Sequence, residues 1–467
     1  MRHRHAAGPV LLVLFLATRA AAQTAPAPQP APPAPPAEAT KPAPAPAPTP
    51  GQVITKWAMT FYGFAEFDMM HDTTQSFTDS PGNGMIVRSD ALTYKNGRTQ
   101  TTARNSRLGV RLAAPESNGI RASGAVEMDF MGNQPAVSEG SFVNNGAFRL
   151  RAAYAKVESD YVDVLAGQNY CVFGFQPFFY PMSISFFGLP NMAFGRTQQL
   201  RLSRLVKTDP ANVEIAAAAF RPPQRDSSLP DFQGGVKVGF NSWKGAHTGG
   251  SGYAAVDPLS IGVSGAARRF RVNEFAAAPS TTNTATGWGV SFDLMIPIIR
   301  AASPDAKGNA LTATGSVVTG HGIGDLLGGL TCGAAFPSVP PAEEGGMAQP
   351  YPANIDAGLV QYDSEGNLRT LNWTTFMGGF QYYLPPKGRV TVGGNYTQGK
   401  SGNITEGLTG AALGGVLKKS QFVEGTVLGD ITPAVRAGAA WQRIHQTRGD
   451  DMTTTNNRFE LSVYFFF

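Results

Sequence analysis

Residues 120–130 read IRASGAVEMDF, and apolar and polar side chains alternate along this stretch. The even positions carry the apolar or small residues Ile120, Ala122, Gly124, Val126, Met128 and Phe130. The odd positions carry Arg121, Ser123, Ala125, Glu127 and Asp129. Because successive side chains of a β-strand point to opposite faces, the stretch predicts a strand with one apolar and one polar face.

The same two-residue period recurs along the chain. It is clear in residues 58–69, 102–112 and 148–157; in the last of these Phe148, Leu150 and Tyr154 oppose Arg149 and Arg151. Further strands are predicted near Tyr161, Gln198, Val213, Phe232, Leu259, Gly287, Asn309, Thr374, Arg389, Lys418, Ala434 and Asn457. The pattern therefore predicts about sixteen strands.

The lengths of the connections test this count, because an even-stranded membrane barrel alternates short periplasmic turns with long outer loops. Short links fall at residues 115–118, 159–160, 207–211, 385–387 and 429–431. Long links fall at residues 70–101, 131–146, 171–196 and 321–371. The two kinds alternate, except that residues 241–258 are long where a turn is due and residues 221–231 form a short outer loop.

The N-terminal residues predict export. Arg2 and Arg4 precede an apolar run at residues 10–17 and a small-residue site at residues 20–22, which is typical of a signal peptide over residues 1–22. Residues 23–51 are dominated by Pro and Ala and are predicted to be an extended periplasmic linker. The predicted barrel covers residues 52–467.

Composition favours a membrane barrel over the other classes. After the signal the chain keeps 35 basic against 33 acidic residues, so its charge gives no reason to expect a nucleic-acid partner. No later run approaches the roughly 18–20 apolar residues of a membrane-spanning helix. We therefore predict an all-β, antiparallel transmembrane β-barrel in the outer membrane of a Gram-negative cell.

The last predicted strand places Phe459, Leu461, Val463, Phe465 and Phe467 on one face. This pattern resembles the C-terminal strand of outer-membrane proteins. The resemblance implies that Phe467 is the assembly signal read by the barrel-assembly machinery.

A barrel of sixteen strands is too wide for its own side chains to fill, so it encloses water and predicts passive diffusion of small hydrophilic solutes. Charged side chains that line such a passage set its selectivity. The predicted lining is basic at Arg107, Arg111, Arg121, Arg149, Arg151 and Arg201, and acidic at Glu66, Asp68, Glu127 and Asp129.

Two features of these charges stay open at this point. The loop at residues 131–146 sets Glu127 and Asp129 opposite Arg151 and Arg149, either as a mutually neutralising structural set or as part of the permeation path. The link at residues 115–118 sets Arg111 nearly opposite Arg121, with Arg107 one repeat further. Like charges that face each other destabilise a strand pair, so their presence favours a functional role for these arginines. The structural alternative is that they pair with an acid on a neighbouring element, such as Glu66.

The long connection at residues 171–196 is aromatic and has no charged residue before Arg196. Its candidate members are Phe173, Phe175, Phe178, Phe179, Tyr180, Phe186, Phe187 and Arg196. Such a loop would not extend into water, so we predict that this third outer loop folds inward and narrows the passage against the basic wall. A plug or a subunit contact without effect on selectivity is the alternative.

Four segments carry a family resemblance: YGFAEFD at residues 62–68, RNSRLG at 104–109, FRLRAAY at 148–154 and LAGQNY at 165–170. They resemble the DcaP-like porins and, more distantly, the phosphate-selective porins. The resemblance implies a sixteen-stranded homotrimeric channel that favours small anions such as dicarboxylates, lined by Arg107, Arg111, Arg149 and Arg151. The Pro/Ala linker departs from the coiled coil that often precedes the barrel in that family.

Other functions find little support. The six histidines form no catalytic set, so we expect no enzyme, and we expect no cofactor or metal site. Cys171 and Cys332 are either a disulfide or two free thiols. The expected partners are outer-membrane lipid, lipopolysaccharide, small hydrophilic or anionic solutes, the barrel-assembly machinery and further copies of the chain. The alternative function is a plugged barrel whose long outer loops serve adhesion or ligand binding.

Overall fold

The computed structural model describes residues 57–82, 84–133, 146–185, 188–250, 252–343, 346–347, 349–350 and 354–467. The predicted signal peptide and the Pro/Ala linker lie outside these residues. In the described part, no helix is both long enough and apolar enough to cross a membrane.

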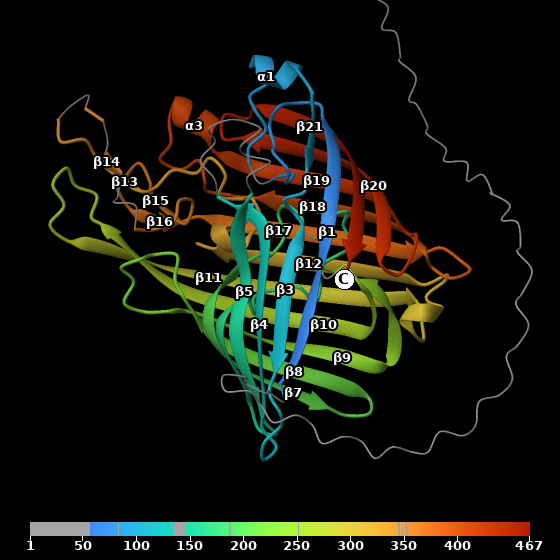
Figure 1. The fold of residues 1–467 in the computed structure, drawn as a ribbon. Coiled ribbons are helices and arrows are strands. Elements are labelled where there is room, and N and C mark those ends of the chain that lie inside the picture. The colour runs from blue at the N-terminus through green and yellow to red at the C-terminus, as the bar shows by residue number, and fades with distance from the viewer. Residues whose placement is uncertain are drawn as a thin grey trace, which may run out of the picture. The chain divides into compact units, whose positions relative to one another are not determined.

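The described chain forms one closed antiparallel β-barrel (Figure 1). Its wall strands are β1 (Ala58–Asp72), β2 (Arg98–Thr102), β3 (Arg107–Ala113), β4 (Arg121–Gly132), β5 (Ala147–Glu158), β6 (Asp163–Tyr170), β7 (Arg196–Lys207), β8 (Ala211–Phe220), β9 (Asp231–Thr248), β10 (Ala254–Asn273), β11 (Thr282–Ile299), β12 (Leu311–His321), β17 (Asn372–Tyr383), β18 (Val390–Lys400), β19 (Leu417–Asp430), β20 (Val435–Arg448) and β21 (Thr453–Phe466).

The wall has sixteen strand positions, which confirms the predicted count. Strands β2 and β3 both pair with β1, at its two ends, and therefore occupy one position. Strand β21 pairs with β1 and closes the sheet. Beyond β21, the backbone of Phe467 exchanges two hydrogen bonds with Gly63. Closure leaves no sheet edge inside the bilayer, where an unpaired backbone group would find no water.

The remaining elements are short and lie in connections. They are α1 (Leu92–Lys95), η1 (Pro304–Ala306), η2 (Gly324–Leu326), α3 (Ala411–Gly415), and the two-stranded hairpins β13 (Ser338–Val339) with β14 (Gln349–Pro350) and β15 (Val360–Tyr362) with β16 (Leu368–Thr370).

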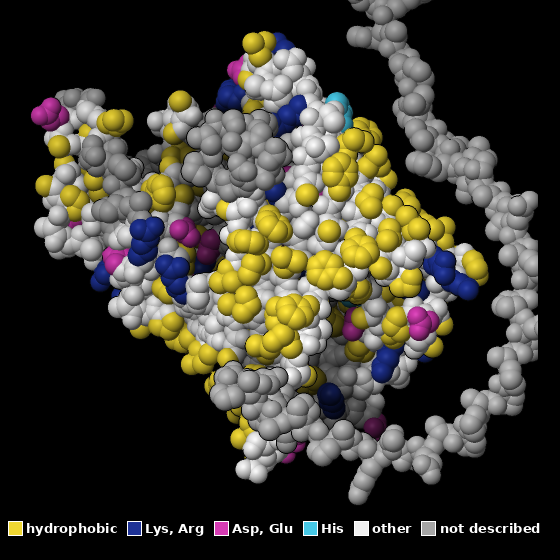
Figure 2. Space-filling view, viewed as in Figure 1, with side chains coloured by type: hydrophobic (Ala, Val, Ile, Leu, Met, Phe, Trp, Pro, Cys, Tyr) yellow, Lys and Arg dark blue, Asp and Glu magenta, His cyan; other side chains and the backbone are white. Residues whose placement is uncertain are grey.

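The two-residue period separates a lipid face from a lumen face. In β21, Leu461, Val463 and Phe465 are about half exposed on the outside, whereas Glu460, Ser462 and Tyr464 are buried inside. Hydrophobic side chains gather over the outer face around β1 and β21 (Figure 2). The apolar residues therefore face lipid and the polar residues face the interior, as a barrel in a bilayer requires.

Two connections fill part of the interior. Residues 171–195, which we name the constriction loop after the role predicted for them, contribute the fully buried Phe173 to an apolar cluster. Ile323, Leu326 and Leu330 from the connection after β12 join the same cluster. The two segments bond directly, because Asn191 N donates to Gly328 O and Gly328 N donates to Met192 O. The apolar core of this protein thus lies inside the barrel, between loops and wall.

The prediction of a long loop at residues 241–258 is wrong. Strand β9 continues to Thr248 and β10 starts at Ala254, so the connection is a short turn. The sequence hid this because the register shifts between Pro258 and Leu259, and such a bulge interrupts the two-residue period.

The side assigned to Tyr154 is also wrong. The pairing of β4 with β5 shifts between Glu127 and Met128, so the faces of β5 switch after Arg151. Tyr154 then lies opposite the buried Ala125 on the lumen face, whereas Ala153 lies opposite Val126, which is 46% exposed on the outer face.

This register shift predicts different costs for two neighbouring substitutions. Ala153→Arg places a charge in the hydrocarbon and is expected to lower the free energy of unfolding by about 2–4 kcal/mol. Tyr154→Arg places the charge in the wet lumen and is expected to lower the free energy of unfolding clearly less. Urea unfolding in lipid vesicles measures both, and the reverse order of costs would contradict the assigned faces.

Candidate functional site

Four guanidinium groups gather on one inner wall of the barrel. Arg107 comes from β3, Arg149 and Arg151 from β5, and Arg196 from the start of β7. We call these four the arginine cluster. They meet because the antiparallel register of β3, β4 and β5 brings Arg107 and Arg149 to the two sides of Asp129.

Two carboxylates of β4 bind part of this cluster. Asp129 accepts from Arg149 Nε and Nη2 at 3.0 and 2.6 Å and from Arg151 Nη1 at 2.9 Å. Glu127 accepts from Arg151 Nε at 2.7 Å. Arg151 also donates to the hydroxyl of Tyr170 at 3.1 Å. The predicted opposition of Glu127 and Asp129 to Arg151 and Arg149 is therefore confirmed as geometry.

The other two arginines keep unused donors. Arg107 is buried, and its guanidinium lies 3.9 Å from Glu127 and stacks over the ring of Phe64. Its Nε and Nη2 have no hydrogen-bond acceptor among the described residues. Arg196 lies over the rings of Tyr170 and Phe194, and its Nη1 likewise has no acceptor in the described part. Four positive groups against two carboxylates leave the cluster with net positive charge and free N–H groups.

The predicted opposition of Arg111 and Arg121 is wrong. Arg111 pairs across β4 with Ala125, and Arg121 pairs across β5 with Glu158. The β3–β4 link is longer than the sequence indicated, because β3 ends at Ala113 and β4 begins at Arg121. An isolated bridge joins Ser117 and Ile120 within it. Arg111 is exposed and stacks on the ring of Tyr62 at 4.1 Å, so like-charge repulsion gives no argument for its role.

The remaining predicted charges are half-buried or buried. Arg201 is half-buried on β7 and donates to Gln199 and to the carbonyl of Tyr170. Glu66 and Asp68 are both buried, bound by Asn105 and Ser462 respectively. Asn105 also donates to Ser185 O of the constriction loop, which places Glu66 beneath that loop.

The constriction loop lies against the far inner wall. Phe173 N donates to Gln233 on β9, and Gly174 N donates to Ser264 on β10. Phe175 and Phe179 pack with Met295 of β11, and Phe178 packs against this group. At Gly262 of β10, an added Cβ would lie 2.7 Å from the Phe179 ring, so a bare backbone is needed there for the loop to approach.

The tip of the loop is bound to the wall strands near the barrel closure. Ser183 donates to Glu424 at 3.1 Å and Ser185 donates to Glu460 at 3.0 Å. Asn395 donates to Met182 O, and Tyr464 donates to Ile184 O. Tyr180 is fully buried. Phe186 and Phe187, the other two predicted loop residues, lie outside the described residues.

Together these contacts place the loop along β9 to β11 and β18 to β21. The loop also touches the side that carries the arginine cluster, since the rings of Tyr180 and Tyr170 lie 6.1 Å apart and Arg196 lies over the ring of Phe194. The arginine cluster therefore lies beside the loop, and Arg149 is its partly exposed member.

Both cysteines are free thiols in the structure. Burial raises the pKa of the Cys171 thiol to about 12 and that of the Cys332 thiol to about 11. Neither thiol is therefore a reactive group at neutral pH.

Comparison with known proteins identifies the family. A model of Gram-negative porins matches residues 10–402. The chain is a Gram-negative porin. It therefore forms a channel in the outer membrane. No curated protein matched the sequence.

Solved structures support the fold of this porin. The outer-membrane channel DcaP of Acinetobacter baumannii is 15% identical, with a TM-score of 0.61, covering 88% of this chain and 97% of the other. An anion-selective porin from Comamonas acidovorans is 10% identical, with a TM-score of 0.50, covering 88% and 100%. At these identities the likeness establishes a shared fold.

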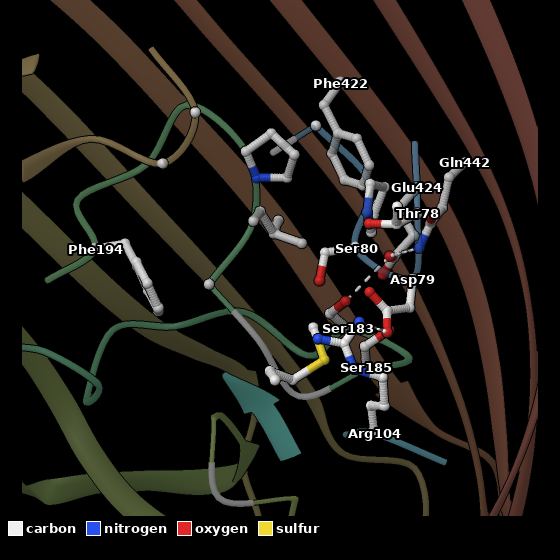
Figure 3. A pocket seen from close by; sticks show the side chains of 18 of the residues that line it. Thr78, Asp79, Ser80, Arg104, Ser183, Ser185, Phe194, Phe422, Glu424 and Gln442 are labelled. Atoms are coloured by element: carbon white, nitrogen blue, oxygen red, sulfur yellow. Dashed lines mark hydrogen bonds and ion pairs between the residues drawn. The ribbon is translucent and has the colours of Figure 1, made fainter. Parts of the chain in front are cut away.

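The porin also has a cavity that the sequence did not predict. It has a volume of about 470 Å³. It lies between the constriction loop, residues 78–82 of the first outer loop, and strands β19 and β20. Arg104 and Asp79 form a buried ion pair at 2.9 Å on its wall, and Arg149 also borders it. Figure 3 shows Phe194 on one side of the cavity, with Asp79, Arg104 and Glu424 on the other.

Sequence reasoning missed these residues for identifiable reasons. Arg104 was part of a quoted motif, but its partner Asp79 lies in a loop without periodicity. The apolar spacing of Ile323, Leu326, Leu327 and Leu330 was the available signal that a second connection enters the barrel.

The arginine side chains suit the site to the recognition of charge. No group of three or more His, Cys, Asp or Glu side chains in the described ranges is arranged to hold a metal ion. Guanidinium groups with free N–H donors bind carboxylates and other oxyanions through charge-assisted hydrogen bonds.

Removing the shared carboxylate is predicted to destabilise the porin strongly. Asp129→Asn leaves Arg149 and Arg151 without their common anion, and the expected loss in the free energy of unfolding is about 3–5 kcal/mol. The matched control Arg111→Gln loses only a stacking contact and is expected to cost at most about 1 kcal/mol. Equal losses in denaturant titrations in vesicles would show that the cluster is not a coupled ion-pair network.

Proposed function

We propose that this porin is a passive channel that prefers small anions, dicarboxylates among them, and that permeating anions pass along the arginine cluster. The observation that carries the proposal is the excess positive charge of the arginine cluster, four guanidinium groups against the two carboxylates of β4. Positive charge in excess of its carboxylate partners, held in a pore wall of low dielectric, attracts a passing anion.

Two further observations support this direction. Arg149 remains partly exposed and borders the outer cavity, which gives an entering anion a charge next to the cluster. The Comamonas porin, which shares the fold, is described as anion-selective. Rings or clusters of arginine in a pore favour anions.

The proposed assembly follows from the family resemblance. We expect a homotrimer, with lipid and lipopolysaccharide around its outer face and with Phe467, half exposed on that face, as the residue read by the barrel-assembly machinery. The mass of the detergent-solubilised protein, measured by sedimentation, tests the trimer.

The reversal potential in a potassium chloride gradient tests the selectivity. Planar bilayers with the wild-type porin are expected to give steady current steps and an anion preference. Arg107→Gln and Arg196→Gln are each expected to lower the chloride-to-potassium permeability ratio by at least about two-fold, which corresponds to roughly 0.4 kcal/mol. A short dicarboxylate is expected to reduce the chloride current of the wild type more than that of the variants.

Arg389→Gln is the control, because Arg389 is exposed at the periplasmic end of the opposite wall. It is expected to leave the ratio nearly unchanged. Heat-modifiable migration in gels shows that each variant is folded. A cation preference of the wild type would overturn the proposed selectivity, and silent bilayers would favour a plugged barrel with binding loops.

A further inference from the structure

The hairpin of β9 and β10 leaves the barrel wall at its periplasmic end. Strand β9 pairs with β8 only as far as Phe240, and beyond that point residues 244–248 pair with β10 alone. The register shift between Pro258 and Leu259 leaves Asn241, Ser242 and Trp243 unmatched. Extra residues on one strand bend a ladder sharply, so the hairpin turns away from the wall at this bulge.

The hairpin bends into the lumen and lies across its periplasmic half. Thr312 of β12 donates to Ala246 O at 2.6 Å, and Thr248 N donates to Gln381 of β17 at 2.8 Å. The Thr248 and Tyr383 hydroxyls lie 2.7 Å apart. The wall residues Thr312, Gln381 and Tyr383 are buried, and their side chains point inward from the wall.

The tip of the hairpin reaches the strands at the barrel closure. Arg436 of β20 donates to Gly252 O at 2.5 Å, and the rings of Tyr253 and Phe466 lie 5.0 Å apart. At the base of the hairpin the backbone of Gly245 lies close to Pro297, since a Cβ on Gly245 would lie 2.4 Å from Pro297 Cβ. These contacts fix the hairpin at its base, along its length and at its tip.

The hairpin also contacts the constriction loop from the periplasmic side. His247 Nε2 lies 3.0 Å from Tyr180 O, and the His247 ring packs near Phe178 at 6.3 Å. Asp257 lies 3.5 Å from His247 Nδ1 and orients the imidazole. The loop turn at residues 178–180 therefore rests on the hairpin as well as on the wall.

We infer that residues 241–258, the periplasmic hairpin, are a second constriction element that narrows the lumen from the periplasmic side and holds the constriction loop in position. The inference rests on the proposed function only in requiring an open passage. Because the hairpin covers β12, β17, β20 and β21, it fills the same side of the lumen as the constriction loop. Solutes then pass the hairpin on the side of the lumen that faces β3 to β7.

A shortened porin tests this inference directly. Residues 241–258 are replaced by Asn-Gly, which joins Phe240 to Leu259 through a two-residue turn. Single-channel conductance is expected to rise, and proteoliposome swelling is expected to admit larger sugars than the wild type admits. A folded shortened porin with unchanged conductance and unchanged sugar limit would overturn the inference.

A second variant keeps the hairpin but removes its anchors. Tyr383→Phe with Arg436→Gln is expected to give a noisier open-channel current, because Thr248 and Gly252 of the hairpin lose their bonds to the wall. The matched control Tyr382→Phe with Lys387→Gln changes the neighbouring tyrosine, which bonds Asn309, and one exposed rim charge. Equal noise in both double variants would contradict the anchoring, while a wild type without any current would refute the channel proposal instead.

Discussion

A sixteen-stranded wall encloses more space than its own side chains fill, and the arrangement of this porin follows from how that space is occupied. The wall itself is required by the bilayer, where every backbone N–H and C=O needs a partner within the protein. Inside it, the constriction loop, residues 323–330 and the periplasmic hairpin supply the apolar packing that a soluble domain places between layers. They pack mainly against β8 to β12 and β17 to β21, and the arginine cluster lies beside the loop on β3 to β7.

The charges of the arginine cluster are only partly paired. Asp129 is shared by Arg149 and Arg151, and this fixes the β4–β5 side of the wall. Arg107 and Arg196 are held mainly by ring contacts, which position a guanidinium without consuming its N–H donors. A fully neutralised cluster would be a structural element alone, whereas the excess positive charge of this one is the basis of the proposed anion preference.

The sequence contained most of the wall and only part of the interior. Alternation predicted all sixteen strand positions and brought Glu127 and Asp129 to Arg151 and Arg149, because both follow from local period and loop length. It failed at Tyr154, at the Arg111–Arg121 pairing and at residues 241–258. In each case one extra residue in a bulge, or a few in a link, changed the register, and such shifts depend on long-range packing rather than on local pattern. The inward path of residues 323–330 depends on partners such as Asn191 and Met192, which are distant in sequence.

The most direct test of this account asks which wall borders the passage. In a background in which Cys171 and Cys332 are replaced by serine, Arg201→Cys lies on the open side and Thr397→Cys lies beneath the constriction loop, bonded to Asn191 and Pro190. The current through single channels is recorded while a small, negatively charged thiol reagent is added. We expect the reagent to reduce the current of the Arg201→Cys porin and to leave that of the Thr397→Cys porin unchanged; block at Thr397→Cys without block at Arg201→Cys would contradict the account.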